Sequence, residues 1–146
     1  ELGGKAPVLV FDDADIDAAI DGIRTFGFYN AGQDCTAACR LYVQDGIYER
    51  FVERLGKAVA SLKPGLQESE ETELGPLISA QHRDKVAGLV QRAIAQPHIR
   101  LVTGGKAIPT ASASASRSPS VFRRFGAGTN EVRRMLIGRE LFAETM

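Results

Sequence analysis

The pattern of apolar and polar residues predicts strands and helices that follow one another along the first hundred residues. Short runs rich in Val, Leu and Ile predict strands at residues 6–11, 41–43 and 99–102, the first of them buried. Isoleucines at positions 16, 20 and 23 predict one apolar face of a helix that reaches about residue 28. Asp13 offers an N-cap for this helix, because its carboxylate can accept hydrogen bonds from the amides of the first turn.

Two more helices are indicated by apolar residues that recur every three or four positions. The first ends before Pro64, and its apolar face consists of Ile47, Phe51, Leu55, Val59 and Leu62. The second begins after Ser79 as its cap, and its apolar face consists of Val86, Leu89, Val90, Ala93 and Ile94. The order strand, helix, strand, helix, helix, strand predicts an α/β domain with a largely parallel sheet.

A different pattern begins after residue 106. Residues 107–120 contain an Ala/Ser repeat that buries too little apolar surface to offset the entropy of ordering, which predicts a flexible linker. Residues 121–146 predict a turn at 126–128 and one C-terminal helix from about residue 129, with apolar positions Val132, Met135, Leu136, Leu141 and Phe142. A lone helix has no partner for its apolar face. It therefore either docks on residues 1–106 or originates from a different protein.

Composition and charge narrow the classes of function. The chain has 146 residues, of which 44% are hydrophobic and 25% charged, as is typical of a globular protein, and it has no apolar run of about 18 residues that would span a membrane. Its net charge of zero hides an asymmetry: residues 1–105 carry 11 basic and 15 acidic side chains, and residues 106–146 carry 7 and 3. The basic residues form no block, which argues against nucleic-acid binding. Two cysteines without a secretory signal favour a reducing, cytoplasmic setting.

Two residues, Cys35 and Glu1, are candidates for chemistry. Cys35 follows a break rich in small residues, where a thiolate could act as a nucleophile, although a lone cysteine is more often an inert small apolar residue. Cys39 is interpreted as structural, because CxxxC is no specific metal pattern and no His lies nearby. Glu1 precedes a Gly-Gly pair that allows close approach to a ligand and could act as a general base, or the pair simply forms a turn.

Taken together, four motifs resemble the aldehyde dehydrogenase superfamily. They are residues 1–7 (ELGGKAP), residues 30–35 (NAGQDC) with Arg40 after them, residues 73–79 (ELGPLIS) and residues 102–105 (VTGG). The resemblance extends to about residue 106 and implies that residues 1–106 are part of the catalytic domain of such an enzyme.

The resemblance also implies roles for individual residues. Cys35 would attack an aldehyde to form a thiohemiacetal, NAD or NADP would accept the hydride, and Glu1 would activate the water that hydrolyses the resulting thioester. The Cys35 backbone N–H would be part of the oxyanion hole, and Leu2 and Gly3 would approach the nicotinamide. Full-length members of the superfamily are expected to be homo-oligomers. For this chain we expect an aldehyde as the small-molecule substrate and no metal ion, nucleic acid or membrane as a partner.

Residues 25–40 look most like the γ-aminobutyraldehyde dehydrogenases, with betaine-aldehyde enzymes next. Asp34 places a negative charge beside the nucleophile, where it could attract an aldehyde that carries an ammonium group. The alternative is that Asp34 faces solvent or ends a helix and contacts no substrate.

The sequence has no counterpart of the family's N-terminal dinucleotide-binding domain, so we expect that this chain alone does not oxidise aldehydes. Residues 121–146 resemble the C-terminal helix of the FAD-dependent acyl-CoA dehydrogenases, without a catalytic residue that carries over. Two alternatives to a fragment of an aldehyde dehydrogenase therefore stay open. One is a chimeric or mis-joined chain with no function of its own, and the other is a remnant of an acyl-CoA dehydrogenase.

Overall fold

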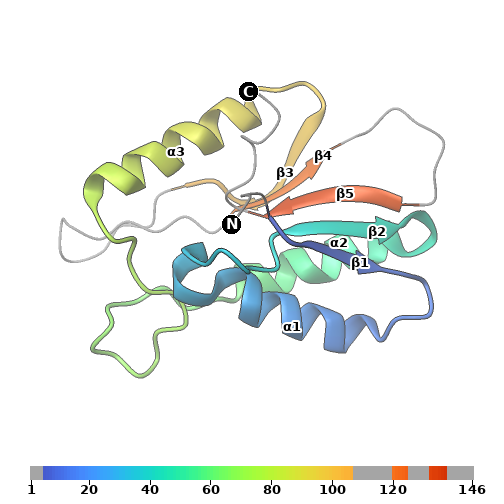
Figure 1. Cartoon of the computed structure of the whole chain (residues 1–146), viewed down its shortest axis with the longest axis horizontal. Helices are drawn as coiled ribbons and strands as arrows, with labels where there is room; N and C mark the ends of the chain where they lie inside the picture. The colour runs from blue at the N-terminus through green and yellow to red at the C-terminus, as the bar shows by residue number, and fades with distance from the viewer. Residues whose placement is uncertain (1–4, 107–119, 125–131, 138–146) are drawn as a thin grey trace.

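The computed structural model describes residues 5–106, 120–124 and 132–137, which form three α-helices, a short 3₁₀ helix and five strands (Figure 1). In chain order the elements are β1 Pro7–Val10, α1 Ile16–Phe28, η1 Tyr29–Gly32, β2 Arg40–Gln44, α2 Asp45–Ala60, α3 Ala80–Ile94, β3 Ile99–Gly104, β4 Ser120–Arg124 and β5 Val132–Ile137. The predicted α/β class is confirmed. Residues 107–119 of the predicted linker lie outside the described residues, and Ser120, its last residue, begins β4.

The strands form one sheet in the order β1-β2-β5-β4-β3. β1 and β2 are parallel, as expected for two strands joined by a crossover helix, and α1 is that helix. The pairs β2–β5, β5–β4 and β4–β3 are antiparallel, so the sheet differs from the largely parallel one predicted. The difference arises because two strands from the last part of the chain enter the middle of the sheet.

The C-terminal helix predicted from about residue 129 is wrong over residues 132–137, which form β5. β5 pairs with β2, where Arg40 lies opposite Leu136, and with β4, where Val121 lies opposite Ile137. As a strand, β5 supplies hydrogen-bond partners to the backbone amides and carbonyls of both β2 and β4, which a helix could not do. Pairing within the sheet therefore overrides the helical periodicity of residues 132–137. The predicted turn at 126–128 and the apolar positions Leu141 and Phe142 lie outside the described residues.

The helix starts follow from capping side chains. Asp15, not Asp13, caps α1, because its Oδ1 accepts hydrogen bonds from the amides of Asp17 at 3.0 Å and Ala18 at 3.1 Å. Ser79 caps α3 as predicted, and its Oγ accepts a hydrogen bond from the His82 amide at 3.1 Å.

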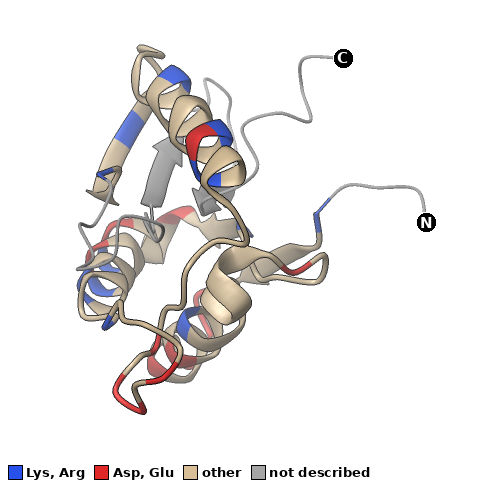
Figure 2. Cartoon of the chain, turned by 90° about the vertical axis from the view of Figure 1, so that its left-hand side faces the viewer, with Lys and Arg blue, Asp and Glu red and all other residues tan. Residues whose placement is uncertain are grey.

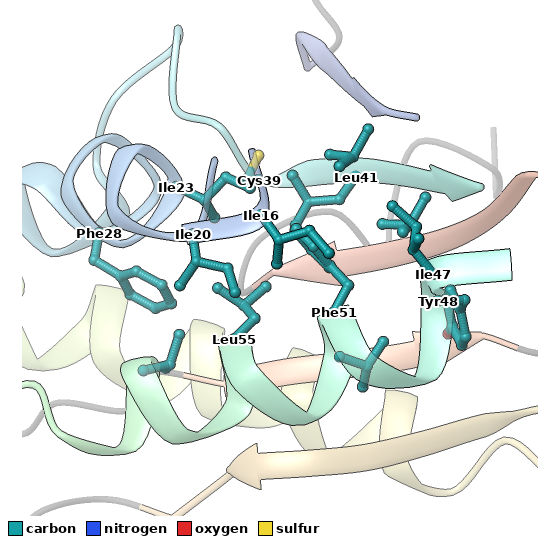
Figure 3. Close-up of a cluster of buried hydrophobic side chains, with 14 of the residues drawn as sticks. Ile16, Ile20, Ile23, Phe28, Cys39, Leu41, Ile47, Tyr48, Phe51 and Leu55 are labelled. Carbon is teal, nitrogen blue, oxygen red and sulfur yellow. The ribbon is translucent and has the colours of Figure 1, made fainter. Parts of the chain in front are cut away.

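The main core lies between α1, α2 and the sheet (Figure 3). In Figure 3 the isoleucines at 16, 20 and 23 of α1 face Phe51 and Leu55 of α2, and Leu41 of β2 lies beside them. Phe51, Leu55 and Leu41 are fully buried. Both predicted apolar faces are therefore confirmed. They hold α1, which precedes Cys35 in the chain, against β2, which follows it.

The two edges of the sheet are less covered. The strand predicted at residues 6–11 is confirmed as β1, but the prediction that it is buried is wrong, because only Val10 is buried and Leu9 is 56% exposed. β1 lies at the edge, and its alternate residues point away from α1 and α2. At the other side α3 lies apart from α1 and α2 and packs against β3 through Val90 and Ala93 (Figures 1 and 2).

The loop between α2 and α3 is acidic, as Figure 2 shows by its red segments. Within it Pro64 and Leu74 form an isolated bridge, and Leu74 is buried in the main core. No helix in the part of the chain that the structure describes is long and apolar enough to cross a membrane.

Candidate active site

Cys35 lies on the turn that joins the end of α1 to the start of β2, and its side chain is exposed. Cys39, four residues later, is buried in the main core at 3% exposure, which agrees with a structural role. The stretch between them is not helical, so the two thiols do not share a helix face. Of the two cysteines, Cys35 is thus the one that a substrate can reach.

The chain reverses sharply before Cys35. Asn30, Ala31 and Gly32 in η1 have φ values of 49°, 57° and 74°, and left-handed backbone is uncommon for residues other than glycine. Hydrogen bonds compensate for this: the Gln33 amide donates to the Asn30 carbonyl at 3.1 Å, and Asn30 Nδ2 donates to the Gln33 carbonyl at 3.1 Å. Strained backbone of this kind persists where the surroundings hold it, often at functional sites.

The Lys5 side chain reaches this turn from the start of β1. Its Nζ donates to the carbonyl oxygen of Asp34 at 2.7 Å and to that of Cys35 at 3.3 Å. The parallel pairing of β1 with β2 brings Pro7 opposite Arg40 and so places Lys5 near the turn. Lys5 was not predicted to have a role, although it is part of the motif at residues 1–7.

The Asp34 side chain stabilises the same turn from within. Its Oδ1 accepts hydrogen bonds from the Thr36 amide and from Thr36 Oγ1, both at 2.9 Å. These bonds lower the pKa of the Asp34 carboxyl, and the bond from the Thr36 amide has the largest effect. The nearby Lys5 charge lowers this pKa by a smaller amount. Asp34 is therefore a carboxylate at neutral pH, and one of its oxygens is hydrogen-bonded within the turn.

A second connection joins the turn to the motif at residues 73–79. Gln33 Oε1 accepts a hydrogen bond from the Ile78 amide at 3.0 Å. Within this motif Glu73 accepts from Arg24 Nη2 at 2.5 Å and from the Lys63 amide at 2.9 Å. The hydrogen bond from Arg24, followed by that from Lys63, lowers the pKa of the Glu73 carboxyl. Three of the four sequence motifs thus meet around Cys35.

The remaining predicted site residues, Glu1, Leu2 and Gly3, lie outside the described residues. Among the residues that the structure does describe, no three His, Cys, Asp or Glu side chains gather in a way that could hold a metal ion. The described part of the site is therefore an exposed thiol on a turn held by Lys5 just before β1, by hydrogen bonds within η1 and the turn, and by the loop before α3.

Comparison with known proteins identifies the family. The aldehyde dehydrogenase family model matches residues 1–133, and so continues past residue 106, where the sequence resemblance was expected to end. Betaine aldehyde dehydrogenase 2 of Rhizobium meliloti is 52% identical over 93 residues, which are 64% of this chain and 19% of that protein. The NADP(+) succinate-semialdehyde dehydrogenase GabD of Escherichia coli is 48% identical over 107 residues, which are 73% of this chain and 22% of that protein.

Solved structures agree with this. Lactaldehyde dehydrogenase from Escherichia coli matches with a TM-score of 0.74 and 40% identity over 82% of this chain and 25% of that one. The NAD+ complex of aldehyde dehydrogenase from Bacillus cereus matches with a TM-score of 0.74 and 32% identity over 82% of this chain and 24% of that one. The chain thus spans about a fifth of the length of the curated relatives it matches. It belongs to the aldehyde dehydrogenase family.

Proposed function

We propose that this chain supplies the nucleophile and the general base of an NAD(P)-dependent aldehyde dehydrogenase, which oxidises an aldehyde to a carboxylate. The observation that carries the proposal is the exposed Cys35 thiol on a turn fixed by Lys5 and by Asp34. A nucleophile held at a fixed, accessible position is what covalent catalysis of acyl transfer requires.

In the first half of the reaction the Cys35 sulfur forms a bond to the aldehyde carbon. The thiol releases its proton to solvent water, and the carbonyl electron pair becomes an oxyanion that the Cys35 backbone N–H stabilises. A bound nicotinamide cofactor, NAD or NADP, would accept the hydride and leave a thioester on Cys35. The exposure of Cys35 leaves its substituent accessible to such a cofactor, and Leu2 and Gly3 are the residues we assign to contact it.

In the second half Glu1 removes a proton from water, which attacks the thioester carbon. The carbon–sulfur bond then breaks, which restores the Cys35 thiolate and frees the carboxylic acid, and this acid releases its remaining proton to water to become the carboxylate. Glu1 lies four residues before Lys5 in the sequence, and four residues of chain span at most about 14 Å. The bond from Lys5 to the Cys35 turn therefore makes a role for Glu1 at the same site feasible by chain length.

Thiol labelling of the purified chain tests the assignment of Cys35. Iodoacetamide should alkylate Cys35 at least about tenfold faster than Cys39, because only the former is exposed. The chain should also become acetylated by p-nitrophenyl acetate, and Cys35→Ser should abolish this reaction while Cys39→Ser should not. Equal labelling of both thiols, or acetylation that survives Cys35→Ser, would refute the assignment.

We further propose that this chain alone does not turn over an aldehyde, because it spans about a fifth of the length of its relatives. The test is NADH or NADPH formation by the purified chain with a panel of aldehydes. Any sustained turnover that Cys35→Ser removes would overturn this proposal. The cytoplasmic setting, the homo-oligomer, the Ala/Ser linker and the resemblance of residues 121–146 to acyl-CoA dehydrogenases stay predictions.

For the substrate we propose an amino-aldehyde, with γ-aminobutyraldehyde as the example. The lowered pKa of Asp34 keeps a negative charge beside the nucleophile, although Thr36 already binds one of its oxygens. Relatives of similar identity are named for betaine aldehyde and for succinate semialdehyde, so the family alone does not select the substrate.

Asp34→Asn separates the charge of Asp34 from its structural role, because Asn keeps an oxygen that can accept from Thr36. In a full-length homologue with this Asp-Cys pair, the preference for 4-aminobutanal over butanal should fall about threefold or more, the effect of one screened charge about 6 Å away. An unchanged preference would show that Asp34 contributes only to the turn.

A further inference from the structure

The Lys5 ammonium group lies against the peptide unit that contains the Cys35 amide. Its Nζ is 2.7 Å from the Asp34 carbonyl oxygen, the short distance typical of a charge-assisted hydrogen bond. The carbonyl of residue 34 and the N–H of residue 35 belong to one planar peptide group. Whatever orients that carbonyl therefore also orients the Cys35 N–H.

The contact with Lys5 also determines the direction in which the Cys35 N–H points. No peptide bond in the described part of the chain is cis, and in a trans peptide the carbonyl and the N–H point in opposite directions. With its carbonyl held by Lys5, the 34–35 peptide unit directs the Cys35 N–H away from the Lys5 side chain. The Cys35 N–H is the backbone donor that the proposed reaction needs for the oxyanion.

The peptide unit on the other side of Cys35 is fixed as well. Lys5 Nζ is 3.3 Å from the Cys35 carbonyl oxygen, and the Thr36 amide of that same unit donates to Asp34 Oδ1 at 2.9 Å. Because both peptide units that flank the Cys35 Cα are held, the direction of its Cα–Cβ bond is also held. The 34–35 peptide unit, which carries the oxyanion donor, is thus held by Lys5, and the unit after Cys35 is held by Lys5 and Asp34 together.

The contact also affects the strength of the donor. A cation at a carbonyl oxygen polarises the peptide group, and hydrogen-bonded groups that polarise one another strengthen cooperatively. The Lys5 charge therefore makes the Cys35 N–H a better donor to a developing oxyanion. It does so without contacting the substrate itself.

We propose that Lys5 is a positioning residue that aligns and polarises the Cys35 amide for oxyanion stabilisation. The proposal rests on the proposed role of Cys35 as nucleophile. It distinguishes two reactions of the same thiol: acetylation by an ester passes through an oxyanion, whereas alkylation by iodoacetamide displaces iodide and forms none. Loss of Lys5 should slow the first reaction more than the second.

The experiment compares Lys5→Met, Lys5→Arg and the control Lys85→Met in the 146-residue chain. Lys85 is an exposed lysine on α3, remote in sequence from the Cys35 turn. The ester is p-nitrophenyl acetate: the Cys35 sulfur bonds to the acetyl carbon, p-nitrophenolate leaves, and the thiol proton passes to water. The rate constant of the p-nitrophenolate burst measures acetylation, and peptide mass spectrometry measures alkylation of Cys35.

Loss of a complete oxyanion donor slows catalysis by about 10²–10³-fold, so misdirection of one should slow acetylation by about tenfold. We expect this loss in Lys5→Met, an alkylation rate within about twofold of the original chain, recovery of acetylation in Lys5→Arg, and no change in Lys85→Met. If acetylation and alkylation slow equally in Lys5→Met, or neither slows, the proposal is overturned.

A failure of the proposed function would look different, because Cys35 of the unmodified chain would then not be acetylated at all. The ¹H–¹⁵N resonance of the Cys35 amide decides the role of Lys5 in that case. A shift of this resonance in Lys5→Met and its recovery in Lys5→Arg would support the alignment of the peptide unit. An unchanged Cys35 resonance in Lys5→Met would refute it.

Discussion

Two glycines of α1 should respond to the same substitution with opposite signs. A Cβ at Gly22 would meet no atom within 4 Å, whereas a Cβ at Gly27 would lie 2.9 Å from the backbone carbonyl oxygen of Ala38. Real Cβ atoms essentially never approach that closely, and a backbone oxygen has little freedom to move aside. Gly22→Ala should therefore stabilise the helix, and Gly27→Ala should force apart the segments on either side of the Cys35 turn.

The magnitudes follow from two effects. Alanine is favoured over glycine inside a helix by about 0.5–1 kcal/mol, which is the full expected gain for Gly22→Ala. For Gly27→Ala the same gain is outweighed by about 1–3 kcal/mol of overpacking, which leaves a net loss of about 1–2 kcal/mol. The two variants should thus differ by about 2 kcal/mol although the chemical change is identical.

Urea unfolding followed by far-ultraviolet circular dichroism measures the difference. With a urea dependence of about 1–3 kcal/mol per molar, the midpoints of the two variants should lie about 1 M apart, on either side of that of the original chain. A Gly27→Ala midpoint equal to or above that of the original chain would show that α1 does not approach Ala38 as described.

Three further predictions concern the core, a helix cap and an ion pair. Phe51→Ala should lower the free energy of unfolding by about 3–5 kcal/mol because Phe51 is fully buried. Phe26→Ala, at a position 65% exposed, should change it by about 0.5 kcal/mol or less; equal effects on urea midpoints would contradict the core assignment. Asp15→Ala should cost about 1 kcal/mol in the same assay, and no loss would rule out its capping bonds. Because Arg24 lowers the pKa of Glu73 in the folded chain below its usual 4.5, this stabilisation is present above about pH 4.5 and is lost as the pH falls through the folded pKa. Glu73→Gln should therefore lower the urea midpoint relative to the original chain at pH 7, and this difference should shrink towards about pH 3. A difference that does not change with pH would refute the stabilisation by the Arg24–Glu73 pair.

Local patterns in the sequence predicted the elements whose burial depends on nearby residues. The isoleucines at 16, 20 and 23 and the apolar face of α2 recur at helical spacing, and both faces are buried as expected. The cap of α1 was misplaced by two residues because Asp13 and Asp15 both precede the helix. The residue that caps is the one next to Ile16, where the helix enters the core.

Non-local contacts were beyond the sequence. The partner of Lys5 is a pair of backbone carbonyls about thirty residues away, and no side-chain pattern marks a carbonyl. Likewise β5 is a strand because β2 and β4 offer it two edges to pair with, and neither edge is visible from residues 132–137 alone. The proposed nucleophile could be named from its motif, whereas the groups that hold its backbone required the fold.

The place of β5 inside the sheet has a consequence for the way the chain folds during its synthesis. β2, which follows the Cys35 turn, has its inner edge open until residues 132–137 have been made. At about 5–20 residues per second, the ribosome needs roughly 5–20 s to make the residues between these two strands. During that time β2 is an unprotected edge, the kind that pairs with other chains and leads to aggregation. The strand next to the proposed nucleophile is thus completed late, and a chaperone that shields nascent strands should increase the yield of folded chain.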